Sequence, residues 1–262
     1  MIRRPFGPAS EQALLLLSRR PGTHDYTAGK NEWRVEDALS ILCRVFPDFV
    51  STIRGMHVLD YGCGTGYQVA ALAKNGASYV AGIDTNPKCL LAARELVRNL
   101  NLQDQVEFFD SFDARLKGRF DIVIAQNSME HFPDPALRLQ EMAAALRPNG
   151  RVFVTFGPPW FAPYGSHMFF FTKLPWVNVV FDETTVLNVR RHFRHDGAKR
   201  YEDVESGLNR MTVRKFERLL ADANVRVLFK KYECVKNIDF LGSIPVIREL
   251  FVNHISIIFA KI

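Results

Sequence analysis

The stretch DYGCGTGYQV, residues 60–69, places Gly62, Gly64 and Gly66 at every second position directly after Asp60. Glycines in this pattern let the backbone adopt left-handed angles and present bare N–H groups to a ligand. Apolar residues of strand length precede the glycines, and YQVAALAK follows them with the pattern of a helix. The stretch therefore predicts a strand–loop–helix unit with a ligand at the carboxyl end of the strand.

The spacing of the glycines narrows the choice of ligand. It reads G-x-G-x-G, and Tyr67 stands where a dinucleotide-binding loop has its last glycine. Asp84 ends the next predicted strand, where a carboxylate accepts hydrogen bonds from a ribose diol. Asp110 ends the third predicted strand and is placed to accept from an adenine amine. This set indicates a ligand shaped like adenosine and argues against a dinucleotide.

Apolar runs of strand length alternate with helical patterns on both sides of the glycines, which is typical of a parallel sheet in an α/β fold. After residue 157 this alternation stops, and residues 157–210 are rich in Pro, Gly, aromatic residues and Arg. Periodic segments return from residue 212 to the end. We therefore expect one α/β domain with four parts: a helical lid (1–50, with Tyr26 or Trp33 as a lid contact), a ligand-binding core (51–156), a helical and aromatic cap (157–210) and a last part of the sheet (211–262).

Composition excludes several classes of protein. The chain has 262 residues, of which 47% are hydrophobic and 24% charged, so it has the composition of a globular protein and not of a disordered one. The four cysteines are scattered, which favours reduced thiols in a cytoplasmic protein over a disulfide framework or a metal site. No apolar run approaches the roughly 20 residues of a membrane span. The net charge of +6 mildly favours an anionic partner.

Several segments together resemble a known family. They are VLDYGCGTGYQVAALA (58–73), the strand ends at Asp84 and Asp110, FDIVIAQNSMEHFPDP (120–135) and ALRPNGRVFVTF (145–156). In order and spacing they resemble the class I S-adenosylmethionine-dependent methyltransferases, particularly the small-molecule branch similar to ubiquinone-biosynthesis methyltransferases. The resemblance implies S-adenosylmethionine as cofactor. It also implies a Rossmann-like sheet of seven strands, mostly parallel with an antiparallel last strand, and helices on both faces.

The resemblance also implies roles for individual residues. The methionine end of the cofactor would be held by Asp60, Gly62, Gly64 and Gly66, and the ribose by Asp84. The adenine would be flanked by Asp110, Ser111 and Phe112. The site beside the sulfonium would be lined by Gln126 and Asn127. No metal is implied.

Transfer of a methyl group to a hydroxyl also requires a base, and histidine suits neutral pH. His131 follows the fourth predicted strand, and His167 lies in the aromatic part of residues 157–210. Each has a structural alternative. His131 could order its loop through a carboxylate such as Glu130 or Asp134, and His167 could belong to an aromatic core.

The basic stretch 188–203 has three interpretations: a solvated surface, a site for an anionic small substrate such as a nucleotide-linked sugar, or a contact for RNA phosphates. Acidic residues on both sides of the stretch weaken the third. The sequence therefore favours a methyltransferase acting on a small molecule, for which a sugar or nucleotide-linked metabolite is a candidate. The alternatives are an RNA methyltransferase and a protein that binds the cofactor without catalysis.

Overall fold

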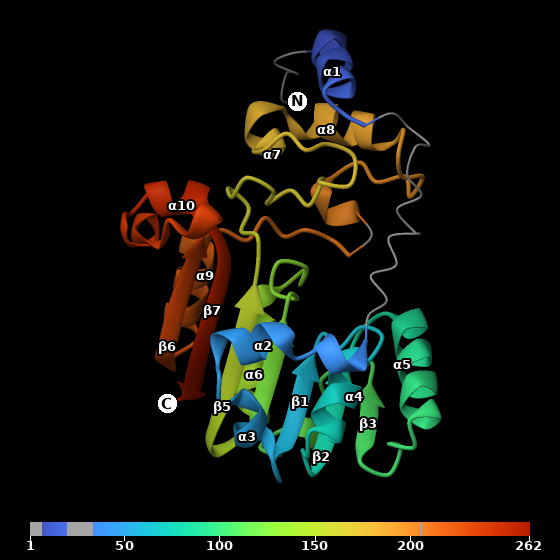
Figure 1. Cartoon of the computed structure of the whole chain (residues 1–262), viewed down its shortest axis with the longest axis vertical. Coiled ribbons are helices and arrows are strands. Elements are labelled where there is room, and N and C mark those ends of the chain that lie inside the picture. The colour runs from blue at the N-terminus through green and yellow to red at the C-terminus, as the bar shows by residue number, and fades with distance from the viewer. Residues whose placement is uncertain (1–6, 20–33, 205) are drawn as a thin grey trace.

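The computed structural model of the chain describes residues 7–19, 34–204 and 206–262, which hold a sheet flanked by helices and a second layer above it (Figure 1). The strands are β1 (His57–Tyr61), β2 (Tyr79–Ile83), β3 (Val106–Phe109), β4 (Phe120–Gln126), β5 (Leu146–Phe156), β6 (Val225–Cys234) and β7 (Val252–Lys261). The α-helices are α1 (Gly7–Leu16), α2 (Ser40–Val45), α3 (Phe49–Ile53), α4 (Tyr67–Lys74), α5 (Pro87–Asn99), α6 (Pro135–Ala145), α7 (Val177–Val180), α8 (Glu183–Arg190), α9 (Val213–Asp222) and α10 (Ile247–Phe251). Short 3-10 helices are η1 (Val35–Asp37), η2 (Ala114–Leu116), η3 (Tyr201–Asp203), η4 (Val235–Asn237) and η5 (Asp239–Ser243).

The strand order within the described residues is β3-β2-β1-β4-β5-β7-β6. Strands β1 to β5 pair in parallel, and β7 is antiparallel to both of its neighbours, β5 and β6. Leu59 of β1 lies opposite Ala81 of β2 and Val123 of β4, so the carboxyl ends of these three strands meet at one edge. The predicted seven-stranded sheet with an antiparallel last strand is confirmed.

Local sequence explains where the helices begin. The side chain of Asn86 accepts hydrogen bonds from the first N–H groups of α5, and Asp134 accepts from Leu137 N at the start of α6. A proline follows each of these caps, at a position where a helix needs no N–H donor. Helix α6 ends at Ala145 and β5 begins at Leu146, two residues before Pro148, which could not continue a helix because it has no N–H donor and its ring would clash with the preceding turn.

Helices cover both faces of the sheet, as predicted. On one face, α6 and α9 bury Leu139 and Phe216 against the strands. On the other face, α3 and α4 bury Phe49 and Leu72. Phe49 lies edge-on to Phe153 of β5, with ring centroids 5.4 Å apart. Burial of such side chains stabilises the layers by about 1.5–3 kcal/mol each.

Residues 157–210 form the cap, which lies above the carboxyl edge of the parallel strands (Figure 1). It has a hydrophobic cluster of its own, built around Trp160, Phe171, Val186 and Tyr201. Leu14 of α1 is buried in the same cluster. The cap is therefore a packed unit and not a loose insertion.

The predicted lid over residues 1–50 divides into two parts. Helix α1 packs on α8 of the cap, where Ser10 Oγ lies 3.0 Å from Thr185 Oγ1. Helices α2 and α3 pack on the sheet instead, where Phe46, which follows α2, and Phe49 of α3 lie edge-on to Phe153. Tyr26 and Trp33, the expected lid contacts, lie outside the described residues.

The four cysteines are free thiols. Within the described parts of the chain, no helix combines the length and apolar character needed to cross a membrane.

Candidate functional site

The glycine loop (residues 62–66) connects β1 to α4. Gly62 and Gly66 have φ angles of 88° and 82°, which L-residues with side chains rarely adopt. A Cβ on Gly62 would lie 2.7 Å from Ser128 Oγ, and one on Gly66 would lie 2.7 Å from the Cβ of Ala93. The loop is therefore pressed between α5 and the segment after β4, and both glycines are required by backbone angle and by space.

Asp84 holds the glycine loop in place. Its Oδ2 accepts a hydrogen bond from Gly64 N at 2.8 Å, and its Oδ1 accepts from Asn86 N at 2.8 Å. An ionised carboxylate has about four acceptor positions, so both oxygens can still accept from a ribose diol. The residue predicted to bind the ribose thus also organises the loop beside it.

Asp60 is the buried carboxyl of the site. It is 2% exposed, and its Oδ2 has no hydrogen-bond partner among the described residues. Burial raises the pKa of Asp60 to about 8, and the nearby charge of Asp84 contributes. Gln126, at the end of the neighbouring strand β4, also has a buried oxygen, Oε1, without a partner in the described structure. Buried acceptors without donors are rare in folded proteins, so these two oxygens indicate a ligand that donates hydrogen bonds at the strand ends.

The remaining predicted cofactor residues lie along the same edge. Asp110 and Ser111 follow β3 and are exposed, and Ser111 Oγ donates to Asp110 Oδ1 at 2.8 Å. Phe112 is half-buried against the core. Asn127 follows β4, where its N–H donates to Thr155 O at 2.7 Å.

This edge fits the cofactor that the resemblance implies. S-adenosylmethionine carries an ammonium group, which suits the unpartnered Oδ2 of buried Asp60, and ribose hydroxyls, which suit Asp84. In the described ranges, no three His, Cys, Asp or Glu side chains gather as metal ligands would.

The two predicted histidines come together from distant segments. The rings of His131 and His167 pack edge to face with centroids 5.4 Å apart. His131 Nδ1 lies 2.7 Å from the carbonyl oxygen of Gly207. Because a carbonyl only accepts, Nδ1 carries the hydrogen, and Nε2 holds the lone pair of the neutral ring. The expected carboxylate partner of His131 is therefore wrong: it hydrogen-bonds to the backbone, and Asp134 caps α6 instead.

Both histidines are neutral at physiological pH. Burial lowers the pKa of His131, which hydrogen bonds to the backbone only partly oppose. Burial, together with the positive charge that His131 carries when it is protonated, lowers the pKa of His167 to about 4. His167 Nε2 is buried and has no partner among the residues described.

A cavity of about 170 Å³ opens beside the two rings. Its lining residues come from the cap and from the segment after β4: His131, Ser166, His167, Met168, Phe170, Arg190, Arg194, Val204, Ser206, Gly207 and Leu208. The histidines and serines make one part of the wall polar, and Met168, Phe170 and Leu208 make another part apolar. The cavity wall therefore has a polar part, whose groups can exchange protons, and an apolar part.

The basic stretch 188–203 partly folds in on itself. Arg190 is 4% exposed and forms two hydrogen bonds of 2.5 Å with Asp196. Arg200 Nε lies 3.1 Å from Glu202. Two of its cations are therefore matched by carboxylates nearby in the chain, which argues against a continuous row of phosphate contacts.

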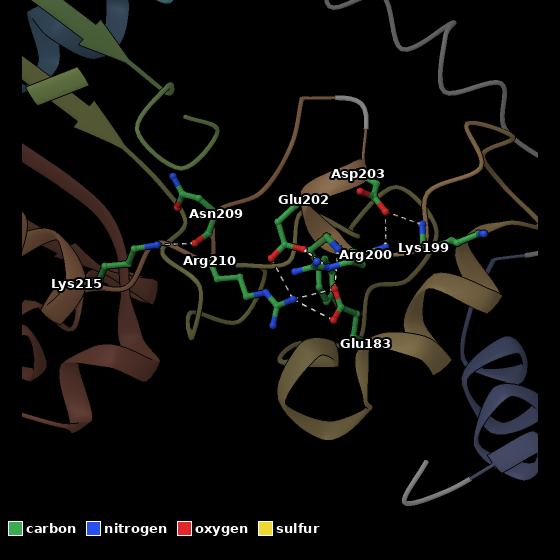
Figure 2. Close-up of polar contacts among 9 residues, drawn as sticks. Glu183, Lys199, Arg200, Glu202, Asp203, Asn209, Arg210 and Lys215 are labelled. Atoms are coloured by element: carbon green, nitrogen blue, oxygen red, sulfur yellow. Dashed lines mark hydrogen bonds and ion pairs between the residues drawn. The ribbon is translucent and has the colours of Figure 1, made fainter. Parts of the chain in front are cut away.

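The junction between the cap and α9 was missed by sequence reasoning. Figure 2 shows Arg210 between Glu183 and Glu202 of the cap, and Lys215 reaching back to Asn209. The side chain of Asn209 donates to Met129 O, 80 residues away, and Arg210 pairs with Glu183, 27 residues away. Neither position has a local pattern, so only the folded chain reveals these contacts.

Glu130 is a further buried group beside His131. It is 3% exposed, and its Oε2 has no partner in the described part of the chain. Burial raises the pKa of Glu130 to about 7, although a hydrogen bond from the Gly157 backbone opposes the rise.

Comparisons with known proteins agree with this geometry. Residues 34–230 match a family model described as a methyltransferase domain. A ubiquinone biosynthesis O-methyltransferase of Coxiella burnetii is 38% identical over 106 residues, which are 39% of this chain and 44% of the relative. The one of Aeromonas salmonicida is 36% identical over 103 residues, 38% of this chain and 43% of the relative. The matches thus span less than half of these relatives.

Solved structures share the fold at low identity. A geranyl diphosphate C-methyltransferase from Streptomyces coelicolor has a TM-score of 0.56 at 15% identity, covering 94% of this chain and 89% of that one. An S-adenosylmethionine dependent methyltransferase from Mesorhizobium loti has a TM-score of 0.55 at 16% identity, covering 86% and 98%. The family model covers well over half of the residues. The chain belongs to the methyltransferase-domain family.

Proposed function

We propose that the protein transfers a methyl group from S-adenosylmethionine to a hydroxyl group of a small molecule. The observation that carries this proposal is the buried Oδ2 of Asp60, without a partner in the described structure, beside a loop of left-handed glycines. An ammonium group at Asp60 would satisfy that acceptor. The ubiquinone biosynthesis O-methyltransferases named above support the choice of a hydroxyl acceptor.

Each cofactor residue has a task in this proposal. Asp60 binds the ammonium group, and Asp84 binds the ribose hydroxyls. The N–H groups of the glycine loop bind the carboxylate of the methionine end. Asp110, Ser111 and Phe112 flank the adenine, and Gln126 and Asn127 line the side of the sulfonium. S-adenosylmethionine supplies an activated methyl group when bound, so the protein needs chiefly to orient the acceptor and to take up its proton.

His131 is the proposed base. Its Nδ1 is committed to the Gly207 carbonyl, and its lowered pKa keeps the ring neutral, so Nε2 can accept a proton. His167 packs on the His131 ring at the same cavity. It is the second candidate for proton uptake, and its pKa of about 4 makes it the weaker base.

The cavity supports a small acceptor. An apolar cavity of about 150 Å³ accommodates benzene, so 170 Å³ suits a group of about one ring. A sugar, or the sugar of a nucleotide-linked metabolite, has this size. The stretch 188–203 also carries exposed basic residues, such as Arg191 and Lys199. They favour an acceptor molecule that has an anionic group attached to the sugar.

Calorimetry and a transfer assay test the proposal. S-adenosylhomocysteine should bind and NAD should not, and labelled S-adenosylmethionine should label a small molecule in a fractionated cell extract. His131→Ala should lower that labelling by about 10²-fold or more without changing cofactor affinity. The matched control is His195→Ala, because His195 is exposed and lies outside the cavity lining. Labelled RNA would favour the alternative acceptor, and binding without any labelled product would favour a non-catalytic protein.

A further inference from the structure

Residues 207–210, the last four residues of the cap and called the strap, link the rest of the cap to the segment after β4. Each residue of the strap makes a hydrogen bond to one of these two parts. Gly207 O bonds to His131, and Leu208 N donates to Tyr201 O of the cap. The strap thus lies between the proposed base and the layer that covers it.

Asn209 is the residue of the strap that binds the turn around His131. Its N–H donates to Glu130 O at 2.9 Å, and its Nδ2 donates to Met129 O at 2.7 Å and to Phe132 O at 2.8 Å. These carbonyls belong to residues on both sides of His131. Because carbonyls only accept, the side-chain nitrogen must face them, and the amide orientation is fixed. Asn209 therefore fixes the backbone turn that carries the proposed base.

Other groups hold Asn209 itself. Lys215 Nζ donates to Asn209 O at 2.7 Å, from helix α9 (Figure 2). The next residue, Arg210, reaches Glu183 at 2.9 Å and lies 5.6 Å from the ring centroids of both Trp160 and Tyr201. The strap is thus fixed to the core on one side of Asn209 and to the cap on the other.

We infer that Asn209 is a positioning residue that holds His131 in the tautomer and orientation needed for proton uptake. The inference rests on the methyl transfer proposed above. Three hydrogen bonds fix the turn, and the turn places the ring so that Nδ1 meets the Gly207 carbonyl and Nε2 remains the proton acceptor. Without the two bonds from the side chain the turn can shift, and a displacement of about 1 Å costs about 10²-fold in rate.

Nuclear magnetic resonance of the histidine rings gives a test that needs no methyl acceptor. The signal of His131 is assigned with His131→Gln, and its tautomer and pKa are read by pH titration. His167, Glu130, Arg190 and Arg194 are adjacent to His131 or line its cavity and influence its titration, so every variant leaves them in place. The variants are Asn209→Ala and Asn209→Asp, the second of which keeps the shape but has no N–H donor.

Asn178→Ala is the matched control. Asn178 Nδ2 also donates to a backbone carbonyl, Trp160 O at 2.8 Å, but Asn178 does not line the cavity beside His131. We expect both Asn209 variants to replace the single Nδ1–H form by a mixture of tautomers, because the bond from His131 Nδ1 to the Gly207 carbonyl is weakened. Asn178→Ala should lower the melting temperature similarly and leave the His131 signals unchanged.

Two results would overturn the inference. One is an unchanged tautomer in folded Asn209→Ala, and the other is an equal change of tautomer in Asn178→Ala. Binding of S-adenosylhomocysteine, measured on the same samples, tests the proposed function separately: its absence in the unaltered protein would refute the cofactor assignment, while the titration would still decide the role of Asn209. Once an acceptor is known, kcat should fall about 10²-fold in both Asn209 variants with cofactor affinity unchanged.

Discussion

The cofactor edge and the histidine cluster are built in opposite ways. At the cofactor edge, Asp60 lies in β1, and the glycine loop and Asp84 follow β1 and β2, which are neighbours both in the sheet and in the chain. Gly64 N bonds to Asp84, 20 residues away. In the histidine cluster, the Gly207 carbonyl that orients His131 lies 76 residues away in the chain. The first site depends on backbone angles in a short segment, whereas the second depends on how the cap sits on the sheet.

The largest expected effect is at the glycine loop. Gly66→Ala should lower the free energy of unfolding by about 2–5 kcal/mol and abolish cofactor binding, because the new Cβ meets Ala93 and a left-handed angle adds about 1–2 kcal/mol. Chemical denaturation and calorimetry measure both. Gly118→Ala is the control: its φ is 63° but nothing lies within 4 Å, so it should cost only the strain of the angle. Equal costs in the two variants would contradict the close packing of the loop.

Acid should lower the free energy of unfolding through His167 in the cap. The pKa of His167 is about 4 in the folded protein and 6.5 in the unfolded chain, so the unfolded chain binds more protons between these values. Stability is therefore retained above pH 6.5 and lost as the pH falls toward 4, by about 3 kcal/mol in total. Denaturation across this range should show a larger loss in the unaltered protein than in His167→Gln. His195→Gln, with an exposed ring, should follow the unaltered protein.

Asp84→Ala should weaken cofactor binding by about 1.5–3 kcal/mol, or about 10- to 150-fold, since it removes charge-assisted hydrogen bonds to the ribose. It also frees Gly64 N, so the loop loses its anchor. Asp110→Ala, which removes one exposed acceptor, should cost only a few-fold. Calorimetry with S-adenosylhomocysteine measures both, and an unchanged affinity in folded Asp84→Ala would place the ribose elsewhere.

The smallest effect concerns the protonation of Asp60. Its pKa of about 8 leaves the carboxyl protonated at lower pH, while an ammonium ligand requires the ionised form. Affinity for S-adenosylhomocysteine should therefore rise with pH, by up to about tenfold per unit below pH 8, with release of a proton. Calorimetry in buffers of different ionisation enthalpy counts that proton. Asp60→Asn should bind more weakly and without this pH dependence, and a dependence retained in Asp60→Asn would assign it to another group.

The sequence by itself determined the sheet, the glycine loop and the carboxylates at its edge. These features depend on local causes: apolar runs of strand length form buried strands, glycines permit left-handed angles, and residues that end parallel strands necessarily meet at one edge.

Only the tertiary structure decided the packing of α1 on the cap, the pairing of His131 with His167 and the contacts of Asn209. His131 was identified from its place after a strand, but its partner is a carbonyl far along the chain instead of a nearby carboxylate. A backbone carbonyl looks the same at every position of a sequence, so no residue pattern marks which one a side chain will meet. The contacts that fix the proposed base arise when the cap docks on the sheet, and they are specified by the whole fold.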